Sequence, residues 1–395
     1  MSRFDKLTNR QNTYSVKWNG PENELPMWVA DMDFETVPEV TEALKERAAH
    51  GIFGYNDIPN EWAESISKWW NRRHNYLMEE ENIMFCTGVV AAISSIVRKI
   101  TQVAENVVVL TPVYNIFFNS IVNNGRNILE SPLVYKDEKY SIDFVDLEEK
   151  LKNPQTSMMI LCNPHNPIGY IWPKETLAKI GRLCKKYNVV VLSDEIHCDI
   201  TDPGCQYIPF ASVNETCKNI SITCSAPTKT FNLAGLHTAF IYCANPVLKH
   251  KVWRGINTDE VAEANTFALT AAINAYTYGD YWLDELREYL YKNKQDVIER
   301  LHKELGYVHV VSSNATYLLW LDCSSFTKDT KEVVDFIKRT TGLKVTYGGV
   351  YGDSGKHFIR MNIACPNERV HDGITRFVSA VKKYVSDGYD SVYLL

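Results

Sequence analysis

The chain has 395 residues, of which 45% are hydrophobic and 23% are charged, and its formal net charge at pH 7 is −6. This composition is typical of soluble globular proteins and argues against a collagen-like, coiled-coil or largely disordered chain. Because the net charge is negative, the chain has no long-range attraction for nucleic acid or for an anionic membrane surface. We therefore expect neither as a partner.

The chain contains ten cysteines but no CxxC pair, and several of them lie inside apolar runs, where cysteine behaves as a small hydrophobic residue. The first 20 residues are polar and lack the apolar core of a signal peptide. No stretch approaches the roughly 18 apolar residues that are needed to span a bilayer. We therefore expect reduced cysteines and a cytoplasmic protein that does not associate with membranes.

In the middle of the chain, short apolar runs alternate with amphipathic helical patterns. The runs that predict buried strands are 82–88, 106–112, 157–164, 188–195, 219–227 and 237–244. Helical patterns between them include 89–100 and 173–187, the second of which places Pro173 at a helix start. This alternation predicts an α/β fold with a mostly parallel sheet that is covered by helices.

From about residue 282 the pattern changes to a long charged helix, 282–305. It is followed by two further helical segments and by strand-like segments at 316–323, 344–350 and 357–365. We therefore expect a large domain of residues 50–280 and a smaller α+β domain. The smaller domain would combine residues 1–49 with residues 281–395.

Lys229 is the only Asp, Glu, Lys or Arg between Asn219 and Leu248. A lysine among small and apolar residues is desolvated, which lowers its pKa and frees the amine to act as a nucleophile. A lysine that forms a Schiff base needs this property. The alternative is a lysine whose ammonium group reaches water, as most lysines do.

Asp194 follows an apolar run, so we expect it at the carboxyl end of a buried strand, where open α/β sheets bind ligands. A buried carboxylate needs a cationic or hydrogen-bonding partner, and the protonated ring nitrogen of pyridoxal phosphate (PLP) is one such partner. The alternative is a helix N-cap. The sequence DEIH at 194–197 could also suggest a metal site, but no HExxH or paired-cysteine motif accompanies it, so we expect no metal.

Three further segments suit ligand binding. Gly88 stands where a strand passes into a helix, which leaves backbone N–H groups for a phosphate, although a turn glycine is the ordinary interpretation. The turn 162–169 offers Asn163 and Asn166, and its alternative is a simple Asn-Pro loop. Arg360 lies in an apolar run and needs a carboxylate, supplied either by a substrate or by the protein itself.

Six motifs in this order resemble the fold type I PLP-dependent enzymes of the aminotransferase class I/II superfamily: TGVV, TPVYNIF, NPHNPIG, SDEIH, SAPTKTFNLAGL and FIRMNIACP. The segments WVADMDF and GIFGYNDIP, with DEIH and TKTFN, resemble more specifically the bacterial cystathionine β-lyase (C–S lyase) subgroup. The resemblance implies a PLP-dependent transferase-like fold, PLP as cofactor and a small amino-acid substrate.

Carried over position by position, the resemblance implies that Lys229 binds PLP covalently and acts as the catalytic base, while Asp194 pairs with the pyridine nitrogen. It implies that Arg360 holds the substrate α-carboxylate. Tyr55 resembles the tyrosine that reaches the cofactor and substrate of a neighbouring subunit, which implies a homodimer with shared active sites.

The resemblance also assigns the remaining cofactor contacts. Asn166 would bond the ring hydroxyl, and Tyr114 would stack on the ring. The phosphate would be held by the backbone N–H groups of Gly88, Val89 and Val90 and by the hydroxyls of Ser225 and Thr228. Two positions depart from many aminotransferases, since His197 replaces a tyrosine near the ring hydroxyl and His237 replaces a phosphate-binding arginine.

The resemblance implies β-elimination from an S-substituted L-cysteine such as L-cystathionine, which releases a thiol (homocysteine), pyruvate and ammonia. One alternative is an aminotransferase that uses the same residues. Another is a PLP-binding regulatory protein that acts through a protein partner.

Overall fold

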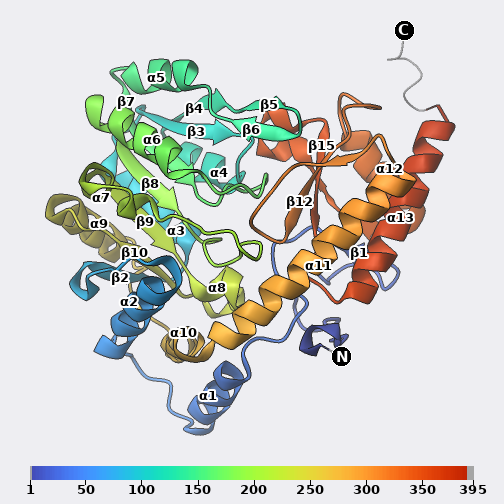
Figure 1. Ribbon diagram of the computed structural model, residues 1–395. Coiled ribbons are helices and arrows are strands. Elements are labelled where there is room, and N and C mark those ends of the chain that lie inside the picture. Colours follow the sequence, from blue (N-terminus) through green and yellow to red (C-terminus); the bar gives the residue numbers. More distant parts are fainter. Residues whose placement is uncertain (1, 389–395) are drawn as a thin grey trace.

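The computed structural model describes residues 2–388 and is built around a seven-stranded sheet (Figure 1). Along the sheet, the strands are ordered β2 (Ile83–Cys86), β10 (Ala239–Tyr242), β9 (Ser221–Ser225), β8 (Val190–Asp194), β7 (Thr156–Cys162), β3 (Asn106–Thr111) and β4 (Asn127–Pro132). Strand β10 runs antiparallel to both of its neighbours, and the other strands are parallel to one another. The sheet is therefore mostly parallel, as predicted.

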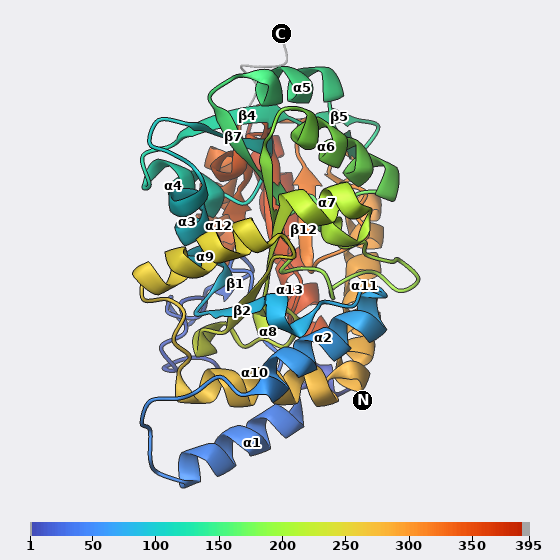
Figure 2. The same cartoon turned by 90° about the vertical axis from the view of Figure 1, so that its left-hand side faces the viewer.

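Helices cover both faces of this sheet (Figure 2). One face packs against α3 (Val89–Ile100), α4 (Ile116–Val122) and α9 (Pro246–Thr258), and the other packs against α5 (Phe144–Lys152), α6 (Lys174–Lys186) and α7 (Glu215–Ile220). On β3, Val107 and Val109 belong to the first core, whereas Val108 and Leu110 belong to the second. Because both faces are buried, the strands read as unbroken apolar runs rather than as alternating patterns.

The C-terminal third forms a second, antiparallel sheet in the order β11 (His309–Val310), β12 (Leu318–Asp322), β15 (Phe358–Asn362) and β14 (Thr346–Tyr347). The long helix α11 (Asp280–Glu304) leads into it, and α12 (Lys331–Thr341) and α13 (Asn367–Ser386) pack beside it (Figure 1). A short hairpin, β5 (Val134–Lys136) and β6 (Lys139–Ser141), follows β4 in the chain and contacts this second sheet, where the hydroxyl of Tyr135 donates a hydrogen bond of 2.8 Å to Asp322.

The N-terminal segment joins both halves of the molecule. Its strand β1 (Leu25–Pro26) pairs in parallel with β13 (Leu343–Lys344) of the C-terminal third. Helix α1 (Pro38–Ala49) instead packs against α10 (Thr266–Tyr278), and α2 (Asn60–His74) packs on the other side of α10. The division into domains at residues 50 and 280 stays a prediction.

The direction of the strands brings the predicted site residues to one edge of the sheet. Strands β2, β3, β7, β8 and β9 all run the same way, so the loops at their carboxyl ends meet. These ends carry, in chain order, Gly88, Tyr114, Asn166, Asp194 and Lys229. A single edge therefore gathers residues that are up to 141 positions apart in the sequence.

All ten cysteines are free, and only Cys205 is partly exposed. This agrees with the expectation that the chain has no disulfide framework. Across residues 2–388, no helix combines the length and the apolar character that crossing a membrane requires.

Candidate active site

Lys229 lies on α8 (Pro227–Thr230), the short helix that follows β9. Its side chain is partly buried, and Nζ donates a hydrogen bond of 2.6 Å to the carbonyl oxygen of Ala30. Burial and the positive charge of Arg360 lower the pKa of Lys229 to about 8. At pH 7.4 about a fifth of the amine is therefore neutral, against roughly one part in a thousand for an ordinary exposed lysine.

Asp194 ends β8 and is 4% exposed. Its carboxylate accepts a hydrogen bond of 3.2 Å from the backbone N–H of Ile196, and it forms no ion pair with any described residue. Burial raises the pKa of Asp194 to about 7, although the charge of Lys229 acts in the opposite direction. Residues 196–199 form turns rather than a helix, so Asp194 is not an N-cap. The site therefore suits a cationic group placed against this carboxylate.

Arg360 comes from β15 of the second sheet and is 6% exposed. Its guanidinium donates hydrogen bonds to Asn166 Oδ1 at 3.3 Å and to the carbonyl oxygen of Trp28 at 2.9 Å, and Nε finds no acceptor in the part of the chain that the structure describes. It lies over the ring of Tyr351, with Cζ 4.9 Å from the ring centroid. Within the described chain Arg360 pairs with no carboxylate, so the alternative of an internal salt bridge is not found. A buried and unpaired guanidinium suits a carboxylate of the substrate.

His197 and Tyr114 remain neutral beside these charged groups. His197 is buried, its Nδ1 has no hydrogen-bond partner among residues 2–388, and burial together with the charges of Lys229 and Arg360 lowers its pKa to about 3. Burial and the negative charge of Asp194 raise the pKa of Tyr114 to about 12. These electrostatic effects require all five side chains to lie near one another, so the structure assembles them into one site.

The start of α3 suits an anion. Gly88 is its N-cap, no side chain caps this end, and nothing lies within 4 Å of the position that a Cβ of Gly88 would take. The first backbone N–H groups of a helix have no partner within it, so those after Gly88 are free to bind a phosphate. Val89 is buried beneath this end, whereas the side chain of Val90 is 41% exposed.

Ser225 and Thr228, which the resemblance assigns to the phosphate, lie at the end of β9 and on α8. The buried hydroxyl of Ser225 donates to the carbonyl oxygen of Glu195 at 3.2 Å, and Thr228 is partly buried at the start of α8. His237 is exposed and ends the short 3₁₀ helix Ala234–Leu236 with a positive φ of 52°. Ser225 therefore already has a backbone acceptor, and the roles of Ser225 and Thr228 at a phosphate stay predictions.

Tyr55 is fully exposed, in the segment that joins α1 to α2. A fully exposed side chain cannot pack against the buried Asp194 or Arg360, so Tyr55 takes no part in the site of its own chain. Its predicted role in a neighbouring subunit's site is untested.

The N-terminal segment contributes backbone oxygens that sequence reasoning missed. The carbonyl of Ala30 accepts hydrogen bonds from Lys229 and from the hydroxyl of Tyr317, the latter at 3.1 Å. The carbonyl of Trp28 accepts from Arg360. The motif WVADMDF marked this segment only through the resemblance, because a carbonyl oxygen belongs to every residue and leaves no signal in the sequence.

Comparison with known proteins places this geometry in a family. The family model described as aminotransferase class I and II matches residues 23–377, and the chain belongs to this family. It is 41% identical over 384 residues to the cystathionine beta-lyase PatB of Bacillus subtilis, a match that covers 96% of this chain and 99% of the relative.

Two solved structures have the same fold. Cystalysin from Treponema denticola, which contains a pyridoxal 5'-phosphate cofactor, is 30% identical with a TM-score of 0.94, over 97% of this chain and 99% of its own. A PLP-bound putative aminotransferase from Clostridium difficile is 34% identical with a TM-score of 0.93, over 96% and 99% of the two chains. The predicted family and the predicted PLP-dependent transferase-like fold are confirmed.

Proposed function

We propose that this protein is a PLP-dependent C–S β-lyase that cleaves L-cystathionine or another S-substituted L-cysteine to a thiol, pyruvate and ammonia. The observation that carries the proposal is the presence, in one site, of two buried and oppositely charged side chains that both lack an ionic partner in the described part of the chain. Asp194 and Arg360 are both buried, carry opposite charges and find no ionic partner among the described residues. Lys229 lies close enough to both for their charges to alter its pKa. The relative PatB, a named cystathionine beta-lyase, supports the lyase assignment.

The residues present fit PLP. Asp194 would pair with the ring nitrogen, Asn166 would bond the ring hydroxyl, Tyr114 would stack on the ring, and the start of α3 would hold the phosphate. The unpartnered Nδ1 of His197 adds a buried polar atom that such a ligand would satisfy. When bound, PLP supplies an electron sink for the bonds at the substrate α-carbon.

The protein's own groups then bind and deprotonate the substrate. Arg360 binds the α-carboxylate through two hydrogen bonds and thereby fixes the orientation of the α-carbon. The α-proton moves to Nζ of Lys229, whose pKa of about 8 suits a general base near neutral pH. The bond between Cβ and sulfur breaks, the thiolate leaves with the electron pair and takes up a proton, and the remaining three-carbon unit is hydrolysed to pyruvate and ammonia.

A homodimer forms part of the proposal. Tyr55 would reach the active site of the partner subunit and contact cofactor and substrate there. Its full exposure supports this role, as do the exposed apolar side chains beside it in the same segment, Ile52, Phe53 and Ile58. We place the enzyme in the cytoplasm, where its ten free cysteines would stay reduced.

The proposal is tested by incubating the purified, PLP-loaded protein with L-cystathionine in the absence of any keto acid and measuring pyruvate. Rapid pyruvate release is expected from the wild type and from K251A, in which an exposed lysine is removed, but not from K229A. Amino transfer that appears only after a keto acid is added would favour the aminotransferase instead. The absence of both reactions would refute the proposal.

A further inference from the structure

Behind Lys229, a buried carboxylate collects three hydrogen bonds. Asp199 is 5% exposed and lies five residues after Asp194. Its Oδ1 lies 2.9 Å from both Trp69 Nε1 and His74 Nε2, and its Oδ2 accepts a hydrogen bond of 2.7 Å from the hydroxyl of Thr230. Thr230 directly follows Lys229, so Asp199 is one hydrogen bond away from the helix that carries the catalytic lysine.

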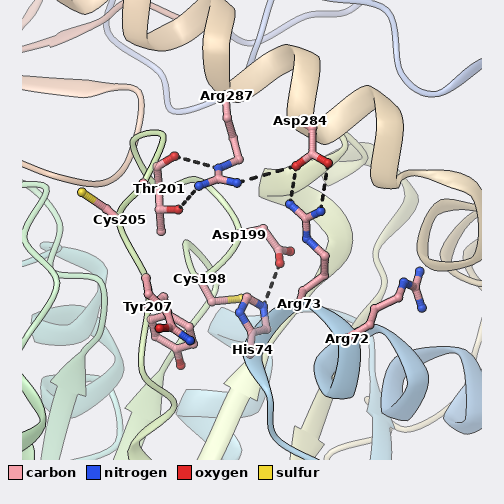
Figure 3. A pocket seen from close by; sticks show the side chains of 12 residues that line it. Arg72, Arg73, His74, Cys198, Asp199, Thr201, Cys205, Tyr207, Asp284 and Arg287 are labelled. Carbon is pink, nitrogen blue, oxygen red and sulfur yellow. Dashed lines mark hydrogen bonds and ion pairs between the residues drawn. The ribbon is translucent and has the colours of Figure 1, made fainter.

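Asp199 and His74 lie beside a cavity of about 410 Å³ (Figure 3). Atoms of His74, Cys198 and Asp199 that could bind a metal lie within 4.8 Å of one another. However, three donors already occupy the oxygens of Asp199, and burial raises the pKa of the Cys198 thiol well above its ordinary value, which disfavours a thiolate ligand. This cluster is therefore a hydrogen-bonding centre and not a metal site.

The arginines around the same cavity do not make it an anion site. Arg73 pairs with Asp284 at 2.7 Å, and Arg287 donates to the carbonyl oxygen and the hydroxyl of Thr201, both at 2.8 Å (Figure 3). An incoming anion would have to break these bonds. The feature of this region that remains without a function is the centre at Asp199.

The segment 194–199 is held on both sides. Asp194 and His197 interact electrostatically with Lys229, whereas Glu195 and Asp199 hold the segment to its surroundings. Glu195 accepts hydrogen bonds from the Ser193 hydroxyl at 2.7 Å and from the Phe210 backbone N–H at 3.0 Å. Asp199 alone extends this support to the helix of Lys229.

Helix α8 depends on such outside support. It has four residues, begins with Pro227 and has no side-chain cap, so it contains few hydrogen bonds of its own. Thr230 is fully buried, and the next residue, Phe231, packs edge-on against Trp69 with ring centroids 5.4 Å apart. Trp69 therefore contacts both Asp199 and the end of α8.

We propose that Asp199 is a positioning residue which, through its hydrogen bond to Thr230, fixes the direction in which Lys229 points, while Trp69 and His74 hold Asp199 in place. The expected effect on kcat rests on the proposed function. The expected effect of the Thr230 hydrogen bond on the pKa of the Lys229 amine is independent of that function. Both consequences are measurable.

The test compares T230V, which removes the hydroxyl with little change in shape, with T230S, which retains it. In T230V we expect kcat for L-cystathionine to fall by roughly 10- to 100-fold with KM changed by less than about threefold, because a misplacement of about 1 Å at a reacting group costs this much. T230S should stay within about threefold of the wild type. T230A replaces T230V if that variant does not fold.

A second readout uses the cofactor-free protein. The pH dependence of amine acylation at Lys229, measured by mass spectrometry of its peptide, has an expected midpoint near pH 8 in the wild type. In T230V this midpoint should move upward, toward that of an ordinary lysine, since Lys229 would leave its position near Arg360. T230S should keep the wild-type midpoint.

The proposal is overturned if T230V keeps both kcat and the acylation midpoint of the wild type, even if its unfolding temperature falls, because the hydrogen bond would then only stabilise the fold. If the wild type releases no pyruvate, the proposed function fails, while the acylation midpoints of T230V and T230S still decide the role of Asp199.

Discussion

The unpaired charge of Asp194 makes the stability of the cofactor-free protein depend on pH. The substitution Asp194→Asn removes the charge but keeps the shape and an oxygen that can accept the hydrogen bond from Ile196. Because burial raises the folded-state pKa from 3.8 to about 7, the folded protein holds this proton more tightly than the unfolded chain does. The contribution of Asp194 to stability is therefore greatest below about pH 4, is lost as the pH rises to about 7, and is constant above that.

The size of the effect follows from the two pKa values. One pH unit corresponds to ~1.4 kcal/mol, so the ionised carboxylate lowers the free energy of unfolding by about 4 kcal/mol at pH 8 and by less than about 1 kcal/mol at pH 4. The free energy of unfolding of cofactor-free D194N, taken relative to that of the wild type, should therefore rise by about 3 to 4 kcal/mol between pH 4 and pH 8. Added PLP should reverse the order at pH 8, because its protonated ring nitrogen would form an ion pair only with the carboxylate of the wild type.

The assay is urea unfolding of the cofactor-free proteins at a series of pH values, followed by tryptophan fluorescence. D199N is the matched control, since Asp199 is equally buried. Although burial acts to raise its pKa, hydrogen bonds from His74, Thr230 and Trp69 hold the pKa of Asp199 below its ordinary value. D199N should therefore be less stable than the wild type at pH 8. If the stability of D194N relative to the wild type did not rise between pH 4 and pH 8, Asp194 would have a partner and the reasoning would be refuted.

Three further predictions concern the site. K229A should lose all measurable pyruvate release while still folding, as circular dichroism would report; turnover like that of the wild type would contradict the role of Lys229. R360Q should raise KM by at least about tenfold. It should also move the acylation midpoint of Lys229 upward, because the charge of Arg360 lowers that pKa; an unchanged midpoint would mean that the two groups lie farther apart. Inactive Y55A mixed with inactive K229A should recover about a quarter of the wild-type activity after subunit exchange, through hybrid dimers with one intact site; no recovery would contradict shared sites.

The central strands could be predicted from the sequence because they are buried on both faces. The unbroken run 106–112 contains β3, and the isolation of Lys229 among apolar residues predicted its lowered pKa. The edge strand β4 could not be predicted, because its residues alternate irregularly between exposed and buried positions. Its pairing with β3 is a tertiary interaction that overrides weak local preference.

The supporting contacts of the site could not be predicted either. Trp69 and Asp199 are 130 residues apart, and Arg360 and Trp28 are 332 residues apart, so no local pattern connects them. Tertiary packing brings these segments together: Trp69 lies on α2, which packs against α10, and Trp28 follows β1, which pairs with β13. Local patterns could therefore identify groups with unmet charges, such as Asp194 and Arg360, whereas the contacts that orient them required the fold.

The measurement that tests the central claim most directly is the location of the cofactor. Borohydride reduction of the PLP-loaded protein, followed by digestion and mass spectrometry, fixes the cofactor to whichever amine carries it. We expect the modification on the peptide that contains Lys229 and on no other. Modification of a different lysine, or no modification at all after PLP is supplied, would contradict the account of the site.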